Sequence, residues 1–168
     1  VLPPNVNESV SSFSVDQGRI RFGLSAIKGL GEGALEGIVE ARAKGRFTSL
    51  YDFCERVSLK LLNKKALETL VRSGAFDEFG KPRSVLVEAL DRAIEAAKSM
   101  QKEAVSSQAS LFGAPAFAAA VKPREVYADL LEWPELERLK AEKEAIGFYV
   151  SGHPLDRYVN DLQRMGLR

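Results

Sequence analysis

Cysteine and histidine are nearly absent from this 168-residue sequence, which contains only Cys54 and His153. One cysteine excludes a disulfide framework and a cysteine-rich zinc site. One histidine argues against a catalytic zinc centre, because such a centre draws on several protein ligands. No run of eighteen apolar residues occurs, so no membrane-spanning helix is expected. We also expect no secretion signal, because the opening residues lack its basic and apolar pattern.

A strong charge of one sign is missing as well, since 24 Lys and Arg against 23 Asp and Glu residues give a net charge of +1. Bulk charge therefore does not indicate a nucleic-acid-binding protein. The distribution is less even: residues 16–72 hold eleven basic and seven acidic side chains, and residues 73–168 hold thirteen and fifteen. This asymmetry weakly favours polyanion binding by the first half. Because the sequence starts at Val1, we expect a module of a longer protein.

Turn residues and apolar spacing predict a mainly α-helical fold with a small N-terminal β-hairpin. Two prolines in residues 1–9 predict an extended lead-in. Residues 13–15 and 20–22 alternate apolar and polar on both sides of a turn with Gly18, which predicts the hairpin. Helical spacing predicts a short helix or turn at 24–28 and helices at about 32–43, 49–57, 63–73, 84–100 and 134–148.

Glycine, serine, proline and alanine dominate the stretch before the last of these helices, which predicts a linker there. The expected organisation is a lead-in and hairpin (1–23), a five-helix unit (24–103), a linker (104–133), and a C-terminal helix with a junction (134–168). Gly and Pro within residues 151–154 are expected to end that last helix.

Gly33 and Gly37 share one face of the helix at 32–43, which predicts the close approach of another backbone.

The sequence Lys28-Gly29-Leu30-Gly31, between two short helices, has the pattern of a helix-hairpin-helix turn. Glycines let the backbone bend without a Cβ in the way, so several N–H groups and the start of the next helix point at one spot. That arrangement suits a phosphate. Leu30 would hold the turn on the core, and Lys28 would add a charged contact. An ordinary interhelical turn with glycine caps is the alternative.

A second, degenerate copy of this unit is predicted at Gly74, where Gly74-Ala75-Phe76 interrupts the helical pattern. Lys64, Lys65 and Arg72 lie nearby and are candidate phosphate contacts. The second glycine of the pattern is missing, so we expect weaker phosphate binding here, if any. The alternative is that Phe76 is simply a core residue. Two such units joined by a helix would grip both strands of a duplex.

The peptide Gln108-Ala109-Ser110-Leu111-Phe112 lies in the predicted linker and is similar to the peptides that bind sliding clamps. Gln108 would fill a polar pocket, while Leu111 and Phe112 would enter an apolar groove, with Ser110 between them. Ordering the flanking residues costs entropy, so the affinity should be modest. A loop anchored by Leu111 and Phe112 on the protein's own core is the alternative.

Three further residues were weighed as catalytic groups. Cys54 lies on an apolar helix face and is expected to be a core thiol. His153 lies in a Gly-His-Pro turn, where a structural role is expected. Asp52 follows the first hairpin at about the distance of the catalytic aspartate of helix-hairpin-helix DNA glycosylases, but its neighbours do not match. No paired carboxylates or metal-ligand clusters stand out.

Together, these pieces resemble the replicative α subunits of bacterial DNA polymerase III, which are C-family polymerases. The resemblance covers nearly the whole chain. It is carried by four segments that are specific jointly rather than singly: the lead-in at 1–7, the first hairpin at 22–31, the second unit at 50–54, 63–64 and 74–77, and the junction at 146–155.

This resemblance implies a tandem helix-hairpin-helix domain that binds template–primer duplex, with Gln108–Phe112 as an internal clamp-binding peptide. The polymerase aspartates would lie elsewhere in the parent protein, so this part alone should be non-catalytic and need no cofactor, whereas the parent polymerase uses Mg²⁺. Its partners would be double-stranded DNA, the sliding clamp and other replisome subunits, with no membrane, in the cytoplasm at the nucleoid. The alternatives are a protein-only scaffold and, less favoured, a DNA glycosylase.

Overall fold

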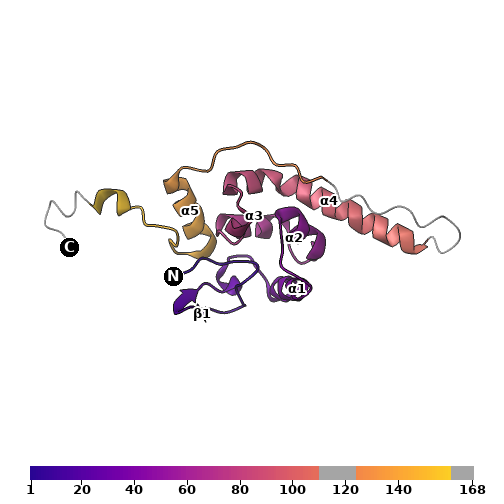
Figure 1. Ribbon diagram of the computed structural model, residues 1–168, viewed down its shortest axis with the longest axis horizontal. Coiled ribbons are helices and arrows are strands. Elements are labelled where there is room, and N and C mark those ends of the chain that lie inside the picture. The colour runs from indigo at the N-terminus through magenta and orange to yellow at the C-terminus, as the bar shows by residue number, and fades with distance from the viewer. Residues whose placement is uncertain (110–123, 160–168) are drawn as a thin grey trace.

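Five α-helices and one short β-hairpin make up the described part of the chain (Figure 1). The structure, a computed structural model, describes residues 1–109 and 124–159, and only the backbone of residues 103–109. The predicted mainly helical fold with an N-terminal hairpin is confirmed. The elements in chain order are β1 (Ser14–Asp16), β2 (Arg19–Arg21), η1 (Leu24–Ala26), α1 (Glu32–Ala43), α2 (Leu50–Arg56), α3 (Lys64–Arg72), η2 (Asp77–Phe79), α4 (Arg83–Ala109), α5 (Glu135–Ile146) and η3 (Asp156–Tyr158).

The hairpin closes through a two-residue turn, as its alternating pattern predicts. Gln17 and Gly18 have φ angles of 47° and 74°, and two positive φ angles are the mark of the type I′ turn that matches strand twist. Val15 lies opposite Ile20 across the two antiparallel strands. Leu2 of the lead-in adds an isolated parallel bridge to Arg21, so the lead-in lies against β2.

Side-chain caps fix where two of the helices begin. The Ser49 hydroxyl accepts a hydrogen bond from the amide of Asp52 at the start of α2, and Asn63 accepts one from Ala66 at the start of α3. These bonds satisfy amides that a helix start leaves without partners. At the C-terminal end of α5, Gly147 with φ 86° stops the helix. The helix therefore ends before the expected stop at residues 151–154, because the left-handed conformation at Gly147 already turns the chain away.

The core lies where α4 crosses α2 and α3. The ring of Phe53 meets those of Phe47 and Phe76 edge-on, with centroids 4.8 and 4.9 Å apart. Apolar residues of α4 at helical spacing are buried, among them Leu86, Ala89 and Leu90. The expectation that Cys54 is a core residue is confirmed, and the alternative that Phe76 is a core residue also holds, since neither has any exposed surface.

The structure differs from the predicted linker at both of its ends. Helix α4 continues through residues 104–109, and residues 124–133 run back over α2 and α4 towards α5, as the arch in Figure 1 shows. Glu132 accepts hydrogen bonds from the amides of Arg83 and Ser84, and so caps the start of α4. The Tyr51 hydroxyl donates to the carbonyl of Val126. Capping by a residue almost fifty positions away has no local sequence signature.

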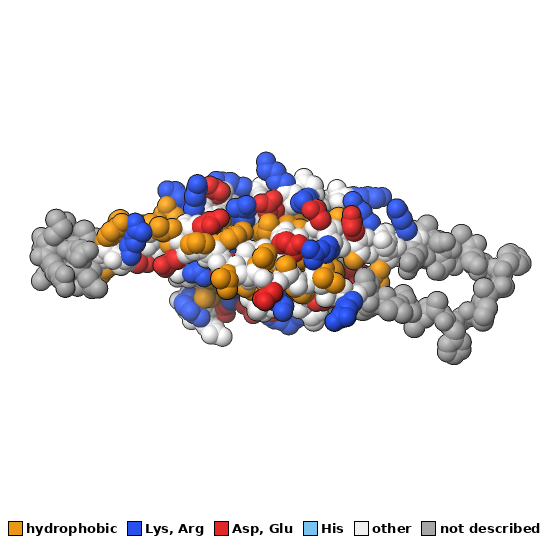
Figure 2. All heavy atoms as spheres, turned by 90° about the horizontal axis from the view of Figure 1, so that it is seen from above, with side chains coloured by type: hydrophobic (Ala, Val, Ile, Leu, Met, Phe, Trp, Pro, Cys, Tyr) orange, Lys and Arg blue, Asp and Glu red, His pale blue; other side chains and the backbone are white. Residues whose placement is uncertain are grey.

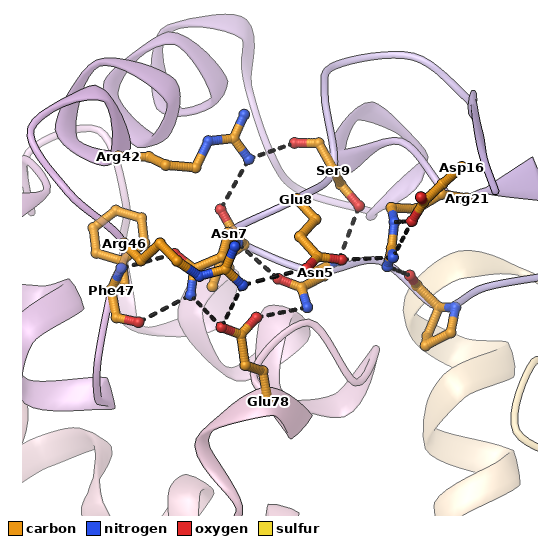
Figure 3. Close-up of polar contacts among 12 residues, drawn as sticks. Asn5, Asn7, Glu8, Ser9, Asp16, Arg21, Arg42, Arg46, Phe47 and Glu78 are labelled. Carbon is orange, nitrogen blue, oxygen red and sulfur yellow. Dashed lines mark hydrogen bonds and ion pairs between the residues drawn. The ribbon is translucent and has the colours of Figure 1, made fainter.

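A polar network ties the lead-in to the helical unit (Figure 3). The side-chain amide of Asn7 bonds both the amide and the carbonyl of Phe47, at 2.7 and 2.9 Å. Glu78 accepts from Asn5, Asn7 and Arg46. Burial alone would raise the pKa of Glu78, but these three hydrogen bonds outweigh it and lower the pKa. The lead-in is therefore an integral part of the fold.

Seen from above, the molecule presents a band of hydrophobic side chains with Lys, Arg, Asp and Glu side chains interspersed around it (Figure 2). Val126, Leu130 and Leu131, from the segment that arches over the helices, are among the exposed hydrophobic residues. Interspersed charges of both signs give this face no uniform field of one sign.

No helix among the described residues combines the length and apolar character needed to cross a membrane.

Candidate nucleic-acid interface

The first glycine corner lies at the surface, between η1 and α1. Gly29 has φ 81°, a left-handed conformation that glycine adopts without steric cost. The amide of Leu30 donates to the carbonyl of Ile27 at 3.3 Å, and the half-buried Leu30 side chain packs against the core. Gly31 is extended and precedes the first residue of α1. The corner therefore has the shape predicted for a helix-hairpin-helix turn.

Several amides at this exposed corner have no hydrogen-bond partner among the described residues. Within residues 1–109 and 124–159, the amides of Gly29, Gly31, Glu32 and Gly33 donate no hydrogen bond. All four residues are exposed. Unlike α2 and α3, helix α1 has no side-chain cap at its start. A helix start with free amides and a positive dipole end favours an anion.

No side chain of the described residues fills the space next to Gly29 and Gly31. A Cβ atom placed on Gly29 or on Gly31 would meet no other atom within 4 Å. The exposed side chain of Lys28 comes from the same turn. Its backbone amide donates to the carbonyl of Ala145 at 2.9 Å, so the last turn of α5 holds the corner from behind. Sequence reasoning did not find this contribution of α5.

A cavity of about 510 Å³ joins the first corner to α3 and α5. Four of the residues predicted to bind DNA line it, namely Lys28, Gly29, Lys65 and Arg72. Glu68 and Glu144 line it too, and Glu68 pairs with Arg72 at 2.8 Å. The cavity wall thus carries three basic and two acidic side chains. Lys64 is directed elsewhere, since its ammonium group pairs with Asp91 on α4 at 2.8 Å.

The second corner, at Gly74, is built differently. Gly74 is buried with φ 85°, and the amides of Gly74 and Ala75 donate to the carbonyls of Val71 and Leu70. These two bonds form the Schellman motif that closes α3. A Cβ on Gly74 would lie 2.5 Å from the guanidinium of Arg83. The position of Gly74 therefore does not support the prediction that it contacts phosphate. Arg83 fills the space beside it, and the amides of Gly74 and Ala75 already have partners.

A buried ion pair holds α5 against the rest of the unit. The guanidinium of Arg83 binds Glu142 at 3.0 Å and Asp77 at 2.6 Å, and both Arg83 and Glu142 are buried. The other carboxylate oxygen of Glu142 accepts from the amides of Val150 and Ser151, each at 3.0 Å. Burial alone would raise the pKa of Glu142, but these backbone hydrogen bonds and Arg83 outweigh it and lower the pKa.

The two glycines inside α1 lie beside side chains and not beside another backbone, contrary to the expectation. Leu61 lies 3.6 Å from a Cβ placed on Gly33 and 4.0 Å from one placed on Gly37. Leu61 is itself largely exposed, so the start of α1 has an apolar neighbour at the surface. Sequence reasoning missed Leu61, because its position beside α1 is a tertiary contact.

The residues weighed for catalysis all have structural surroundings. Asp52 accepts from the amide of Thr48 and pairs with Arg56, both at 3.0 Å. Burial raises the pKa of Cys54 to about 12, which keeps its thiol protonated and unreactive. The ring of His153 accepts from the amide of Leu155. The described residues contain no group of three or more His, Cys, Asp or Glu side chains placed to hold a metal.

Two residues of the predicted clamp-binding peptide, Gln108 and Ala109, lie in a described element. Gln108 belongs to the last turn of α4, where the backbone alone is described. Ser110, Leu111 and Phe112 lie outside the described residues. The clamp-binding role of Gln108, Ser110, Leu111 and Phe112 remains a prediction.

A glycine corner between two helical segments, with free amides at the start of α1, defines a helix-hairpin-helix unit. A family model described as a helix-hairpin-helix motif matches residues 1–86, and the chain belongs to this family. Almost the whole chain is also similar to DNA polymerase III subunit alpha: 42% identical over 169 residues in Vibrio cholerae, 41% over 169 in Escherichia coli K12, and 46% over 162 in Deinococcus radiodurans. The resemblance inferred from the sequence is confirmed.

These alignments cover 98%, 98% and 94% of the chain but only 14%, 14% and 12% of the relatives. The chain thus spans about one seventh of the length of the first two curated relatives. The helix-hairpin-helix match covers residues 1–86, and the similarity to the polymerase subunits extends over almost the whole chain.

Proposed function

We propose that this chain is the duplex-binding module of a DNA polymerase III α subunit, and that it holds the DNA backbone without reading the base sequence. The observation that carries the proposal is the uncapped, exposed start of α1 behind Gly29 and Gly31. Backbone amides and a helix start bind phosphate oxygens, and such contacts carry no sequence information. The family match and the similarity to polymerase subunits support the same function.

On this proposal, one phosphate binds at the amides of Gly31, Glu32 and Gly33, with Lys28 beside them. Lys65 and Arg72, across the shared cavity, meet the backbone further along. Glu32 in the first turn and the Glu68 partner of Arg72 place negative charge nearby. Binding is therefore weak, because these carboxylates offset part of the attraction.

The second part of the proposal concerns Gln108, Ser110, Leu111 and Phe112, which tether the polymerase to the sliding clamp. The peptide begins in the last turn of α4, which extends to Ala109. Two weak contacts on one polypeptide, one to duplex and one to the clamp, act together through effective concentration. This combination would support processive synthesis in the cytoplasm. The nucleotidyl transfer and its Mg²⁺ belong to the rest of the parent polypeptide.

A titration of unrelated duplex sequences at several salt concentrations tests the DNA-binding part. With roughly two to four phosphates neutralised, log K against log salt should fall with a slope of about −2 to −4. Affinities for the different sequences should agree with one another. A flat salt dependence, or strong preference for one sequence, would contradict the proposal and would favour a protein-only scaffold or a sequence-reading protein.

A further inference from the structure

The apolar side of the β-hairpin faces solvent, whereas an ordinary half-buried sheet exposes its polar side. On its polar side, Arg21 is only 8% exposed and pairs with Asp16 at 2.5 Å and Glu8 at 2.6 Å. On its apolar side, the opposed residues Val15 and Ile20 are 79% and 53% exposed. A sheet with one solvated side normally turns its polar side to water. On the charged side of this hairpin, Arg21 is instead turned towards the lead-in, whereas Arg19 is exposed.

The exposed apolar surface continues beyond the two strands. The rings of Phe13 and Phe148 flank that of Phe22, with centroids 4.9 and 5.9 Å away. Phe13 is 54% exposed and Phe148 is 62% exposed. Phe13, Val15 and Ile20 lie on one side of the hairpin by strand alternation. We refer to Phe13, Val15, Ile20 and Phe148 as the hairpin face. Figure 1 shows the hairpin beside the C-terminal end of α5 and away from α2 and α4.

One backbone edge of the hairpin is also open. The edge of β2 is occupied by the lead-in, since Leu2 donates to the carbonyl of Ile20 at 2.7 Å and accepts from Phe22 at 3.1 Å. Among the described residues, β1 pairs with β2 alone. An exposed edge beside an exposed apolar side is a surface that other polypeptide segments join readily.

We infer that the hairpin face is an intramolecular docking surface, covered in the full-length polymerase subunit by another part of the same polypeptide. The inference rests on the proposed function, because it takes the chain to be part of such a subunit. The curated relatives contain this chain as about one seventh of their length, so most of their polypeptide lies outside it. Contiguous exposed apolar side chains such as those of the hairpin face mark surfaces that another polypeptide segment covers.

DNA is a poorer occupant for this surface. Protein surfaces that bind duplex are polar and strongly positive, whereas the hairpin face is made of four apolar side chains. The corner proposed to bind phosphate is a separate feature, built from the start of α1. The surface that binds duplex and the surface that docks the rest of the polypeptide are therefore different parts of the same module.

The test uses the full-length subunit with a photo-crosslinking amino acid in place of Val15, and in a second variant in place of Ile20. Mass spectrometry should identify crosslinks to peptides of the same polypeptide outside these 168 residues. Crosslinks to a second copy, to DNA or to another protein would overturn the inference.

Cysteine labelling keeps the test decisive if no crosslink forms. In the full-length Val15→Cys variant, maleimide labelling should be at least tenfold slower than at the same residue after unfolding in urea. The exposed Ala43→Cys position on α1 serves as the control and should react at close to its unfolded rate. Equal reactivity at positions 15 and 43 would overturn the inference.

The two proposals fail separately. A Val15→Thr and Ile20→Thr double variant should bind duplex as the unaltered protein does. If the hairpin face proves open while duplex binding behaves as expected, only the docking inference is lost. If the salt titration fails while Val15 is protected, only the DNA-binding function is lost.

Discussion

The backbone amide of Lys28 donates a 2.9 Å hydrogen bond to the carbonyl of Ala145, and this bond joins the glycine corner to the last turn of α5. Helix α5 is in turn held by the buried pair of Glu142 and Arg83. The corner proposed to bind phosphate thus depends on a helix more than a hundred residues away in the sequence. Changes within α5 should therefore reach both the stability of the fold and its affinity for duplex.

Replacing Glu142 by alanine should destabilise the protein by about 3–5 kcal/mol, because it leaves the buried guanidinium of Arg83 with only Asp77 as an ionic partner. The loss is measured as the free energy of unfolding in urea. Glu144→Ala removes an exposed carboxylate from the same helix and should change stability by no more than about 0.5 kcal/mol. Equal effects of the two substitutions would show that the buried pair does not hold α5.

Acidification should weaken the fold through Glu78 and Glu142. Both carboxyl groups have a pKa below the ordinary value of 4.5 in the folded state, because the hydrogen bonds they accept outweigh the effect of burial. A depressed pKa stabilises the folded state above the unfolded pKa, and this stabilisation is lost as the pH falls through the folded pKa. The unfolding free energy should therefore decline below about pH 4.5. The decline should be shallower in Glu78→Gln, and an unchanged profile would contradict the assignment.

Alanine at Gly74 should be far more damaging than alanine at Gly80. Both glycines have positive φ, so each substitution carries about 1–2 kcal/mol of backbone strain. At Gly80 a Cβ meets nothing within 4 Å, whereas at Gly74 it would lie 2.5 Å from a guanidinium that Asp77 and Glu142 hold in place. Thermal unfolding of Gly74→Ala and Gly80→Ala compares them. Similar midpoints would contradict the structural role given to Gly74.

The clamp-binding peptide can be tested separately from DNA binding. Leu111→Ala with Phe112→Ala should abolish retention by an immobilised sliding clamp, because both apolar groups that would enter its groove are lost. Duplex affinity of the same variant should be unchanged. Phe117→Ala, which alters an aromatic residue outside the motif, is the matched control. Undiminished clamp retention by the double variant would remove the tether from the account.

Local sequence features were enough to predict the helices and the hairpin. The caps at Ser49 and Asn63, the glycine corner at 28–31 and the turn at Gly18 are each encoded within a few residues, so pattern and turn chemistry locate them. Helix α1 begins and ends where the spacing indicated. The first half of the candidate site could be predicted because a helix-hairpin-helix turn is itself a local motif.

Long-range contacts could not be predicted in this way. The side chains of Glu132, Glu142 and Asn7 look like surface residues in the sequence, yet they cap α4, pair with Arg83 and bond the backbone of Phe47. The glycine pattern indicated a degenerate second copy at Gly74, with weaker phosphate binding than at Gly29, if any. The structure gives it a Schellman turn under Arg83, because the packing of α4 and α5 decides what lies in front of that corner.

The most direct test of the central claim is the duplex affinity of Gly31→Asp. An aspartate at this position would cap α1 with its own carboxylate, as Asn63 caps α3, and would occupy the amides that are proposed to bind phosphate. The free energy of unfolding should stay unchanged or rise by a few tenths of a kcal/mol, while duplex binding weakens about tenfold, equivalent to roughly 1.4 kcal/mol. Ala43→Asp places the same charge at the far end of α1 and should weaken binding much less. If Gly31→Asp binds duplex as tightly as the unaltered protein, or no more weakly than Ala43→Asp, the start of α1 is not the phosphate site.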